Sequence, residues 1–429
     1  MKKQKVLGGG LLRKLRYPTI LIVVVGACLF MLEHSKKETI LQEEIIENTL
    51  AIYLEDEPIN YIPAKDSGYT LDLMKSSCTN GVEVTFDYNT WSVKTNYSNY
   101  TYENNERVKC SLYFRKISFA EAVTTCGTLG ENASNCIQEN FFLSSEIIED
   151  ETNDNNLRFI GADPKNYVWF NDELWRIIGV MNNIDDGTGK KETRIKIIRN
   201  EPIGNYSWDN KGELGENDWS QSSLQTVLNE GPYWNRTSGE CPYGQNGVTI
   251  TCDFSGIGLT EEAKAMISNA VWTLGGLSGE ENDPNYSIEA NSSTWYIYER
   301  GTEVYSGRPT EWTGQIGLMY PSDYGYATSG GSIYDRNECL ENPLYNWNNI
   351  DVVLEDCYNN NWLEDGVWSW TLTPWESTSY GIYVTNNRHV DIGFVYGSNY
   401  MVIPVVYLIS SVKVTGGDGS SSNPFQLNF

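Results

Sequence analysis

Leu174–Arg199, LWRIIGVMNNIDDGTGKKETRIKIIR, is the stretch that indicates the fold of the larger part of this chain. Its two ends, Leu174–Val180 and Thr193–Arg199, are rich in β-branched residues and are typical of strands. Between them Asp185–Gly189 (DDGTG) has the residues that tight turns prefer, so the stretch predicts a β-hairpin. The same acidic turn could be a calcium loop, but its spacing does not follow the EF-hand pattern.

Two helices are expected after this hairpin. A serine at position 220 or 222 can cap the first, Leu224–Asn229. The second begins after Thr260, carries an apolar face as far as Val271 and ends at Gly275-Gly276. We interpret that face as part of the hydrophobic core.

The last third of the chain returns to strands. An antiparallel meander is predicted from three segments separated by Asn and Gly turns, namely Gly381–Thr385, His389–Val395 and Tyr400–Ser410. Strands mixed with a few helices, without regular βαβ spacing, predict the α+β class for residues 157–429.

The N-terminus carries a basic segment followed by the apolar run Pro18–Leu32. We expect a cytoplasmic tail over 1–17, an uncleaved single-pass membrane anchor with its flank over 18–37, a helical stalk over 38–50 and an extracellular C-terminal body. A cleaved signal peptide is a second interpretation. A third is acylation at Cys28, because Val25–Cys28 resembles a bacterial lipobox.

The charge distribution restricts the partners. Residues 1–37 have eight Lys or Arg and one Glu, a net of +7, so the chain's total of −26 leaves −33 for the rest. Such a body is expected to repel nucleic acid, and its partners should be neutral or cationic. Simple solubility is the alternative explanation.

The cysteines predict a disulfide framework and therefore an oxidising compartment. None has a CxxC spacing or a nearby histidine, which argues against zinc. Apart from Cys28 they fall into four sequential pairs: Cys78/Cys110, Cys126/Cys136, Cys241/Cys252 and Cys339/Cys357. Short loops favour this sequential pairing.

Between the stalk and the larger domain we expect two further parts. Residues 51–115 predict a small β domain stapled by Cys78–Cys110, and residues 116–156 a linker with a helix. The run Glu149–Asn156 (EDETNDNN) is interpreted as the polar boundary before the domain that follows.

Several separated phrases of the larger domain occur together in order. They are Arg158–Val168 (RFIGADPKNYV), Glu173–Val180 (ELWRIIGV), Gly317–Tyr326 (GLMYPSDYGY), Trp370–Pro374 (WTLTP) and Pro404–Leu408 (PVVYL). With these phrases the chain resembles a bacterial surface-protein family of unknown function over roughly residues 157–429. That resemblance implies no activity.

A weaker resemblance is to the C-type-lectin-like and sulfatase-modifying-factor fold. It rests on Tyr320–Tyr324 (YPSDY), Trp368–Thr373 and Ile403–Leu408, and it implies a C-type-lectin-like α+β core. The chain has Ile403 where the last motif often has arginine, and it lacks the calcium-binding triplets of true lectins. The resemblance therefore does not imply calcium-dependent sugar binding.

No catalytic constellation stands out in the sequence. The chain has two histidines, His34 and His389, and we expect His389 to be a solvent-facing strand residue. The many carboxylates have no diagnostic spacing. We therefore predict no catalytic residue, no metal site and no cofactor, and consider an enzyme the less favoured reading.

Aromatic residues are the remaining functional signal, because their faces stack on sugar rings and anchor interfaces. Tyrosines in loops, such as Tyr324 and Tyr326, are expected to be the more exposed ones. The candidate ligand-binding residues are Trp312, Tyr320, Asp323, Tyr324, Tyr326, Trp370, Trp375, Tyr380 and Tyr383.

These observations predict a surface protein that binds a neutral glycan or a protein through aromatic loops. Two alternatives stay open: a hydrolase that acts on envelope polysaccharide with paired carboxylates, and a structural surface-coat protein. The sequence does not indicate the oligomeric state.

Overall fold

A computed structural model describes residues 50–63, 69–87, 90–100, 108–116, 147–150, 152–276, 288–302, 307–349, 352–363, 366–375, 379–417 and 419–428. The chain forms two compact units, one from residues 1–64 and 69–115 and the other from residues 65–68 and 116–429. The described helices are all too short or too polar to cross a membrane. The predicted anchor, Cys28 and residues 38–49 of the predicted stalk lie outside the described residues.

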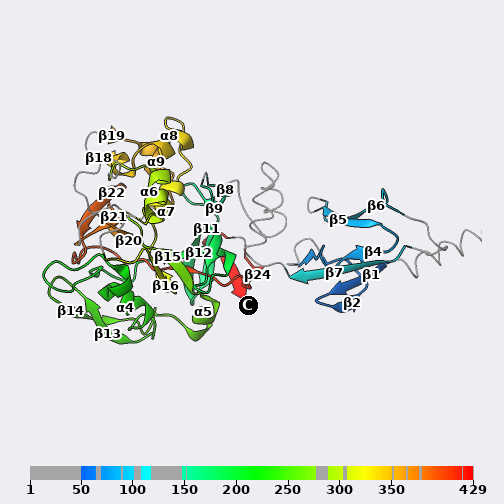
Figure 1. The fold of residues 1–429 in the computed structure, drawn as a ribbon, viewed down its shortest axis with the longest axis horizontal. Coiled ribbons are helices and arrows are strands. Elements are labelled where there is room, and N and C mark those ends of the chain that lie inside the picture. The colour runs from blue at the N-terminus through cyan, green and yellow to red at the C-terminus, as the bar shows by residue number, and fades with distance from the viewer. Residues whose placement is uncertain are drawn as a thin grey trace, which may run out of the picture. The chain divides into compact units, whose positions relative to one another are not determined.

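The first unit is built from strands. Its five-stranded sheet has the order β2-β1-β7-β3 with β4 paired to β7, and β5 and β6 form a separate hairpin (Figure 1). The strands are β1 (Leu50–Leu54), β2 (Glu57–Ile59), β3 (Tyr69–Leu71), β4 (Ser77–Cys78), β5 (Glu83–Asp87), β6 (Ser92–Asn96) and β7 (Cys110–Lys116).

The core of the first unit is small: its main cluster of buried apolar side chains is Ile52, Leu71, Leu112 and Phe114. Cys78 lies directly opposite Cys110 in the β4–β7 pair, and the two form the predicted disulfide. A cross-link of this kind contributes about 2–4 kcal/mol, which matters most where little apolar surface is buried.

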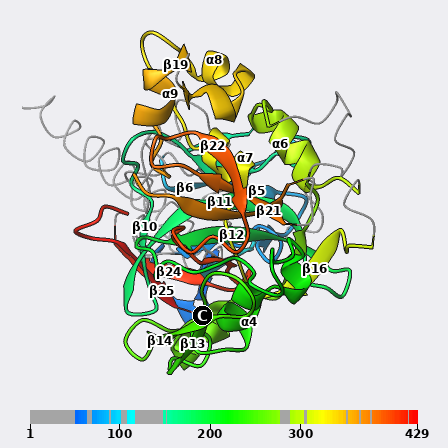
Figure 2. The ribbon, with the colours of Figure 1, turned by 90° about the vertical axis from the view of Figure 1, so that its left-hand side faces the viewer.

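The second unit is organised around a nine-stranded sheet of order β17-β23-β12-β11-β10-β25-β24, with β9 joining β11 and β8 joining β9. Figure 2 shows β10, β11 and β12 crossing this unit. The strands of this sheet are β8 (Ile147–Glu149), β9 (Leu157–Phe159), β10 (Tyr167–Phe170), β11 (Glu173–Asp185), β12 (Lys191–Arg199), β17 (Ile316–Gly317), β23 (Val405–Tyr407), β24 (Lys413–Gly416) and β25 (Phe425–Asn428).

Smaller sheets and short helices cover this sheet. The strands are β13 (Ser238–Pro242) with β14 (Thr249–Asp253), β15 (Ala270–Thr273) with β16 (Glu311–Gly314), β18 (Asn348–Asn349) with β19 (Val352–Val353), and the three-stranded sheet β20 (Ser369–Pro374), β21 (Tyr380–Val384) and β22 (Val390–Phe394). The helices are η2 (Trp219–Gln221), α4 (Ser223–Asn229), α5 (Glu261–Met266), α6 (Ser292–Glu299), α7 (Pro321–Tyr326), α8 (Arg336–Glu341), η3 (Leu344–Asn346) and α9 (Glu355–Asn359).

The predicted hairpin is confirmed: β11 and β12 pair antiparallel, with Trp175 opposite Arg199 and Asp185 opposite Lys191. At the turn the Asp185 carboxylate accepts hydrogen bonds from the backbone N–H groups of Gly187 (2.8 Å) and Gly189 (3.0 Å). Both glycines have φ of +89°, a conformation that side chains with a Cβ rarely adopt. The acidic turn is therefore explained by hairpin geometry.

The predicted α+β class is wrong, because the structure is mostly β, with 39% strand and 14% helix. The helix expected after Thr260 shows why. It ends at Met266, since Ile267 adopts an extended conformation and bridges Leu408. The apolar residues after it form strand β15, because they pair with β16 instead of continuing a helical face.

The predicted meander is also partly wrong. Strands β21 and β22 pair as expected, but β23 leaves them and joins β12 and β17 in the nine-stranded sheet. Strand β20 takes the third place beside β21. The segment before β23 contains Pro404, which has no backbone N–H for a strand ladder.

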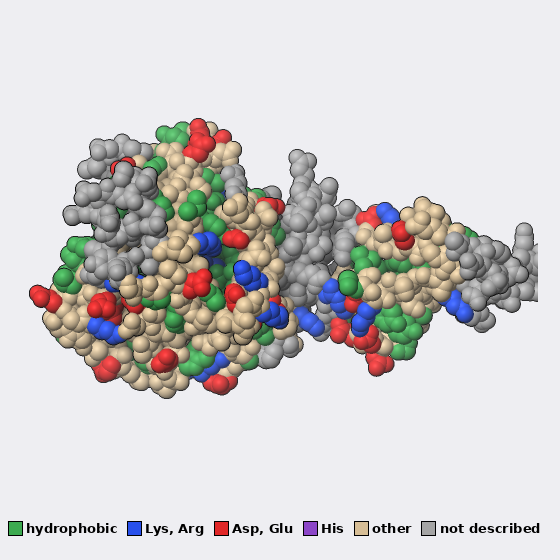
Figure 3. All heavy atoms as spheres, viewed as in Figure 1, with side chains coloured by type: hydrophobic (Ala, Val, Ile, Leu, Met, Phe, Trp, Pro, Cys, Tyr) green, Lys and Arg blue, Asp and Glu red, His purple; other side chains and the backbone are tan. Residues whose placement is uncertain are grey.

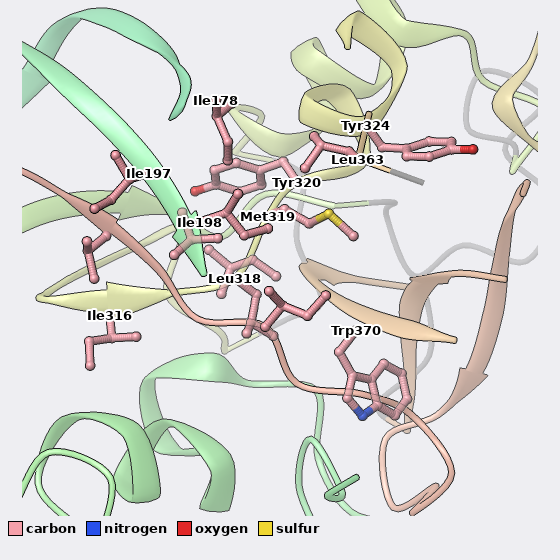
Figure 4. Packing of buried hydrophobic residues seen from close by; sticks show 14 of the residues in the cluster. Ile178, Ile197, Ile198, Ile316, Leu318, Met319, Tyr320, Tyr324, Leu363 and Trp370 are labelled. Atoms are coloured by element: carbon pink, nitrogen blue, oxygen red, sulfur yellow. The ribbon is translucent and has the colours of Figure 1, made fainter. Parts of the chain in front are cut away.

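The core of the second unit lies between the nine-stranded sheet and the elements that cover it. Figure 4 shows Ile197 and Ile198 of β12 beside Ile316, Leu318 and Tyr320, which lead into helix α7. Two disulfides of this unit form as predicted and are buried with the core, Cys241–Cys252 across the β13–β14 hairpin and Cys339–Cys357 between α8 and α9. Cys126 and Cys136 lie outside the described residues.

Candidate functional site

Four charged side chains form an ionic network inside the second unit. The Arg158 guanidinium donates from Nε to Asp150 Oδ2 and from Nη1 to Asp323 Oδ1, both at 2.7 Å. Lys196 Nζ donates to Asp323 Oδ2 at 2.5 Å. None of the four residues is more than 3% exposed. Because a buried charge is costly unless it is paired, these residues depend on one another.

Local structure places each member of the network. Arg158 and Lys196 lie on β9 and β12, and both are in register with Gly179 of β11, which separates their strands. A Cβ at Gly179 would lie 2.1 Å from the Leu157 carbonyl oxygen, so only glycine allows this approach. Asp323 lies in the first turn of α7, where its carboxylate accepts the Tyr320 backbone N–H at 2.9 Å.

The pKa values show which protonation states the network holds. Burial alone would raise the pKa of the Asp323 carboxyl, but the charges of Lys196 and Arg158 outweigh it and lower the pKa to about 2. Burial lowers the pKa of the Lys196 ammonium to about 8 although Asp323 opposes the change. Asp323 is therefore ionised throughout the physiological range.

A fifth buried acid, Glu299, ties α6 to α7. It accepts hydrogen bonds from the Ser322 backbone N–H (2.8 Å) and from the Ser322 hydroxyl (2.5 Å). Burial raises the pKa of the Glu299 carboxyl to about 7, while Arg300 and Ser322 act in the opposite direction.

A pocket of about 230 Å³ lies beside the ionic network. Its lining residues are Asp154, Asn156, Met181, Asn182, Asn183, Ile184, Asp185, Lys191, Val271, Thr273, Tyr296, Arg300, Glu311, Tyr320 and Tyr407. We call this cavity the tyrosine pocket. The rings of Tyr320 and Tyr407 line it and also contact Lys196, whose Nζ is 4.5 and 5.6 Å from their centroids. These two rings lie between Lys196 and the pocket, while Asn156, which also lines the pocket, donates from Nδ2 to the network carboxylate of Asp150 at 3.2 Å.

Hydrogen bonds hold the aromatic side of the tyrosine pocket in place. The Tyr296 hydroxyl donates to Asp154 and accepts from Asn156 Nδ2 at 3.1 Å. The Tyr320 hydroxyl donates to the Thr273 carbonyl at 2.9 Å. The Arg300 guanidinium lies on the Tyr296 ring, with Cζ 3.3 Å from its centroid.

The pocket combines groups that suit a small polar ligand. It contains three phenol rings, three carboxamides, three carboxylates and two cations. Lys191 of β12 and Glu311 of β16 are exposed, and neither forms an ion pair with another residue that the structure describes. Rings with an apolar face, surrounded by both donors and acceptors, can bind a polyhydroxylated molecule.

The candidate residues predicted from sequence do not form one site. Tyr320 lines the tyrosine pocket, and Asp323 is buried in the ionic network below it. The expectation that Tyr324 and Tyr326 are exposed on a loop is wrong. Both lie on α7 with exposures of 0% and 1%, and the Tyr324 hydroxyl donates to the Arg388 carbonyl at 3.0 Å.

The remaining aromatic candidates lie elsewhere in the second unit. Trp370 and Tyr383 are buried against Tyr400, at centroid distances of 4.1 and 4.4 Å. Three others, Trp312, Trp375 and Tyr380, are half-buried. His389 is also half-buried rather than solvent-facing, its Nδ1 is 3.1 Å from the Thr385 hydroxyl, and burial lowers the pKa of its imidazole.

Sequence reasoning missed Arg158, Lys196, Tyr296 and Arg300. It also interpreted Glu149–Asn156 as a polar boundary, whereas Asp150 and Asn156 are 3% and 2% exposed. One signal was present: Lys196 interrupts the apolar run Ile195–Ile198, and a cation on a buried strand requires an acid.

Comparison of the chain with protein-family models, curated proteins and solved structures returns no match. Within the described parts of the chain, no group of three or more His, Cys, Asp or Glu side chains could hold a metal ion.

Proposed function

We propose that this chain is a cell-surface binding protein whose second unit takes one neutral sugar residue of a glycan into the tyrosine pocket. The observation that carries the proposal is the lining of that pocket. Three tyrosines, three carboxamides and charges of both signs surround a space of about 230 Å³. Pockets for drug-sized ligands are about 300–1,000 Å³, so this one suits a single small ring.

The charges favour a ligand without net charge. Two cations, Lys191 and Arg300, face three carboxylates, Asp154, Asp185 and Glu311, so a strongly charged ligand of either sign would meet like charge. Sugar hydroxyls donate and accept, and can therefore use both kinds of group. The pocket is also built largely on β11, β12, β15, β16 and α6, which limits the ordering cost of binding.

Surface display is supported by the disulfides and by the N-terminal sequence. Three described disulfides require an oxidising compartment. The basic segment before Pro18–Leu32 favours an N-terminus inside the cell and a body outside. Accessibility of the body to protease added to intact cells tests this part of the proposal.

Binding is tested by applying the full-length chain, purified in detergent, to an array of neutral and charged glycans. We expect a signal on neutral glycans that share one terminal residue. Arg300→Gln should weaken it about tenfold, because the guanidinium lies on the Tyr296 ring in the pocket. Glu341→Gln, an exposed acid on α8 outside the pocket, is the matched control. Silence on every glycan would contradict the proposal.

Hydrolysis of the bound glycan is a second candidate, favoured by the three carboxylates in the same pocket. Release of reducing ends from the glycan that binds best, abolished by Asp154→Asn, would support it. Binding without product release would leave the protein a binding module.

A further inference from the structure

A second pocket, of about 220 Å³, lies between β10, β25 and α5 and shares no residue with the tyrosine pocket. Its lining residues are Trp169, Phe170, Asn171, Asp172, Thr260, Glu262, Ala263, Met266, Gln426 and Leu427. We call it the Trp169 pocket. Nothing in the proposed glycan binding uses it.

Pairing of β10 with two neighbouring strands fixes the backbone of Trp169, and its ring is exposed on the surface of the sheet. Trp169 lies on β10, between β11 and β25, opposite Leu174 on one side and Gln426 on the other. Its neighbours Val168 and Phe170 point into the core with exposures of 0% and 2%, so strand alternation turns Trp169 outward. At 43% it is the most exposed of the fourteen tryptophans. A large exposed ring on a central strand is a feature that binding sites use.

The base of the Trp169 pocket is apolar. Ala263 and Met266 of α5 line it and are 2% and 6% exposed. These side chains can accept alkyl groups from a ligand, while the ring of Trp169 offers a face beside them.

The rim is acidic. Glu262, in the first turn of α5, is exposed and forms no ion pair with any described residue. The Asp172 side chain is 74% exposed and forms a long ion pair with Arg236, whose Nη1 is 3.8 Å from Asp172 Oδ2. The two carboxamides of the lining already donate to backbone carbonyls, Asn171 Nδ2 to Gly258 at 3.3 Å and Gln426 Nε2 to Pro424 at 3.0 Å. The rim thus offers negative charge to a ligand.

We propose that the Trp169 pocket binds an organic cation, a quaternary or primary alkylammonium group. The cation lies over the Trp169 ring, its alkyl substituents contact Ala263 and Met266, and Glu262 and Asp172 supply the opposite charge. Tryptophan is the best aromatic partner for such cations. The net charge of −26 attracts cations to the protein at longer range. Figure 3 shows acidic and basic side chains interspersed on one face of this unit.

The test is titration of the full-length chain with choline and with its neutral carbon isostere, 3,3-dimethylbutan-1-ol, followed by ligand-observed NMR. The two probes have nearly the same shape and differ in charge. We expect choline to bind in the millimolar range and the isostere to bind at least about fivefold more weakly. Equal affinities, or no choline binding up to about 50 mM, would overturn the proposal.

Variants locate the site. Trp169→Leu should weaken choline binding about fivefold or more, because it removes the aromatic face. Trp169→Phe, which keeps an aromatic ring, should retain most of the binding. Glu262→Gln should weaken the binding about threefold, because it removes one negative charge. The matched control is Trp368→Leu, because Trp368 is the other exposed tryptophan at 39% and lies outside the pocket. Choline binding that survives Trp169→Leu would refute the assignment. Glu311→Gln changes the tyrosine pocket and should leave choline binding unchanged. The proposal for the Trp169 pocket can therefore be refuted without affecting the proposal for glycan binding, and the reverse also holds.

Discussion

The ionic network and the tyrosine pocket lie on either side of the Tyr320 and Tyr407 rings, and they differ in how their charged groups are paired. On the network side, Asp150, Arg158, Lys196 and Asp323 are almost completely buried, and each has a partner at 2.5–2.7 Å. On the pocket side, Arg300 Nε lies 3.8 Å from Asp154 Oδ2, but Lys191 and Glu311 are exposed and form no ion pair with a described residue. The first arrangement holds the fold in one state, while the second leaves hydrogen-bonding capacity for a ligand. Substitutions on the network side should therefore change stability, and substitutions on the pocket side should change binding.

The largest effect is expected from Asp323→Asn. The carboxamide cannot neutralise Arg158 and Lys196, which stay buried with only Asp150 as a counter-charge. Breaking a buried pair in this way costs about 3–5 kcal/mol of unfolding free energy. Denaturant unfolding of the purified protein measures it, with Glu341→Gln as the exposed control. A loss below about 1 kcal/mol would show that the network does not hold the fold.

The second prediction is a pH dependence from Glu299. Its pKa is about 7 in the fold against 4.5 for an ordinary glutamate. Between these values the folded state binds more protons than the unfolded chain, so the stabilisation is complete below pH 4.5 and is lost as the pH rises through 7. The change amounts to about 3 kcal/mol. Unfolding free energies measured at several pH values should show this fall.

Glu299→Gln tests the assignment of that pH dependence. The glutamine carbonyl can still accept the Ser322 backbone N–H, but it does not titrate. The variant should therefore lose the fall between pH 4.5 and 7 and keep the loss below pH 3.8, where Asp323 becomes protonated as its pKa of about 2 is approached. An unchanged slope in Glu299→Gln would refute the role of Glu299.

The third prediction concerns the ring that both regions share. Tyr320→Phe keeps the ring between Lys196 and the pocket but removes the hydroxyl that donates to the Thr273 carbonyl. We expect a loss of about 1 kcal/mol in unfolding free energy and a modest change in glycan affinity. Thermal unfolding and the glycan-array signal, measured on the same preparation, show whether the substitution changes both stability and binding. If neither quantity changed, the Tyr320 hydroxyl would have no role in positioning the ring.

Local features of the fold could be predicted from the sequence, whereas the network could not. The β11–β12 hairpin and the described disulfides join segments that are close in the chain, and turn residues or short loops indicate them. Asp323 lies 165 positions from Arg158 and 127 from Lys196, so no local pattern relates them. The register that brings them together comes from the whole nine-stranded sheet.

Amphipathic residues explain the errors in the predicted site. A tyrosine can bury its ring while its hydroxyl forms a hydrogen bond, as the Tyr324 hydroxyl does with the Arg388 carbonyl. Residue type alone therefore did not show which tyrosines are buried and which are exposed. The expected helix beyond Thr260 failed for a similar reason. Ala270 has helical spacing from Met266 and Ile267, but it is buried together with Trp272 two positions on, which is strand alternation, and pairing with β16 decided between the two.

The smallest effect on stability is expected from Lys191→Gln and Glu311→Gln. Exposed substitutions without a close partner usually change unfolding free energy by less than about 0.5 kcal/mol. If a sugar hydroxyl contacts these groups, each change should nevertheless weaken glycan binding about threefold, because one charge-assisted hydrogen bond becomes a neutral one. Isothermal titration with the best array glycan measures the affinity, and denaturant unfolding measures the stability. Glu341→Gln should change neither quantity. If the pocket variants lowered stability as much as Asp323→Asn does, the division between a structural and a binding side of Tyr320 would not hold.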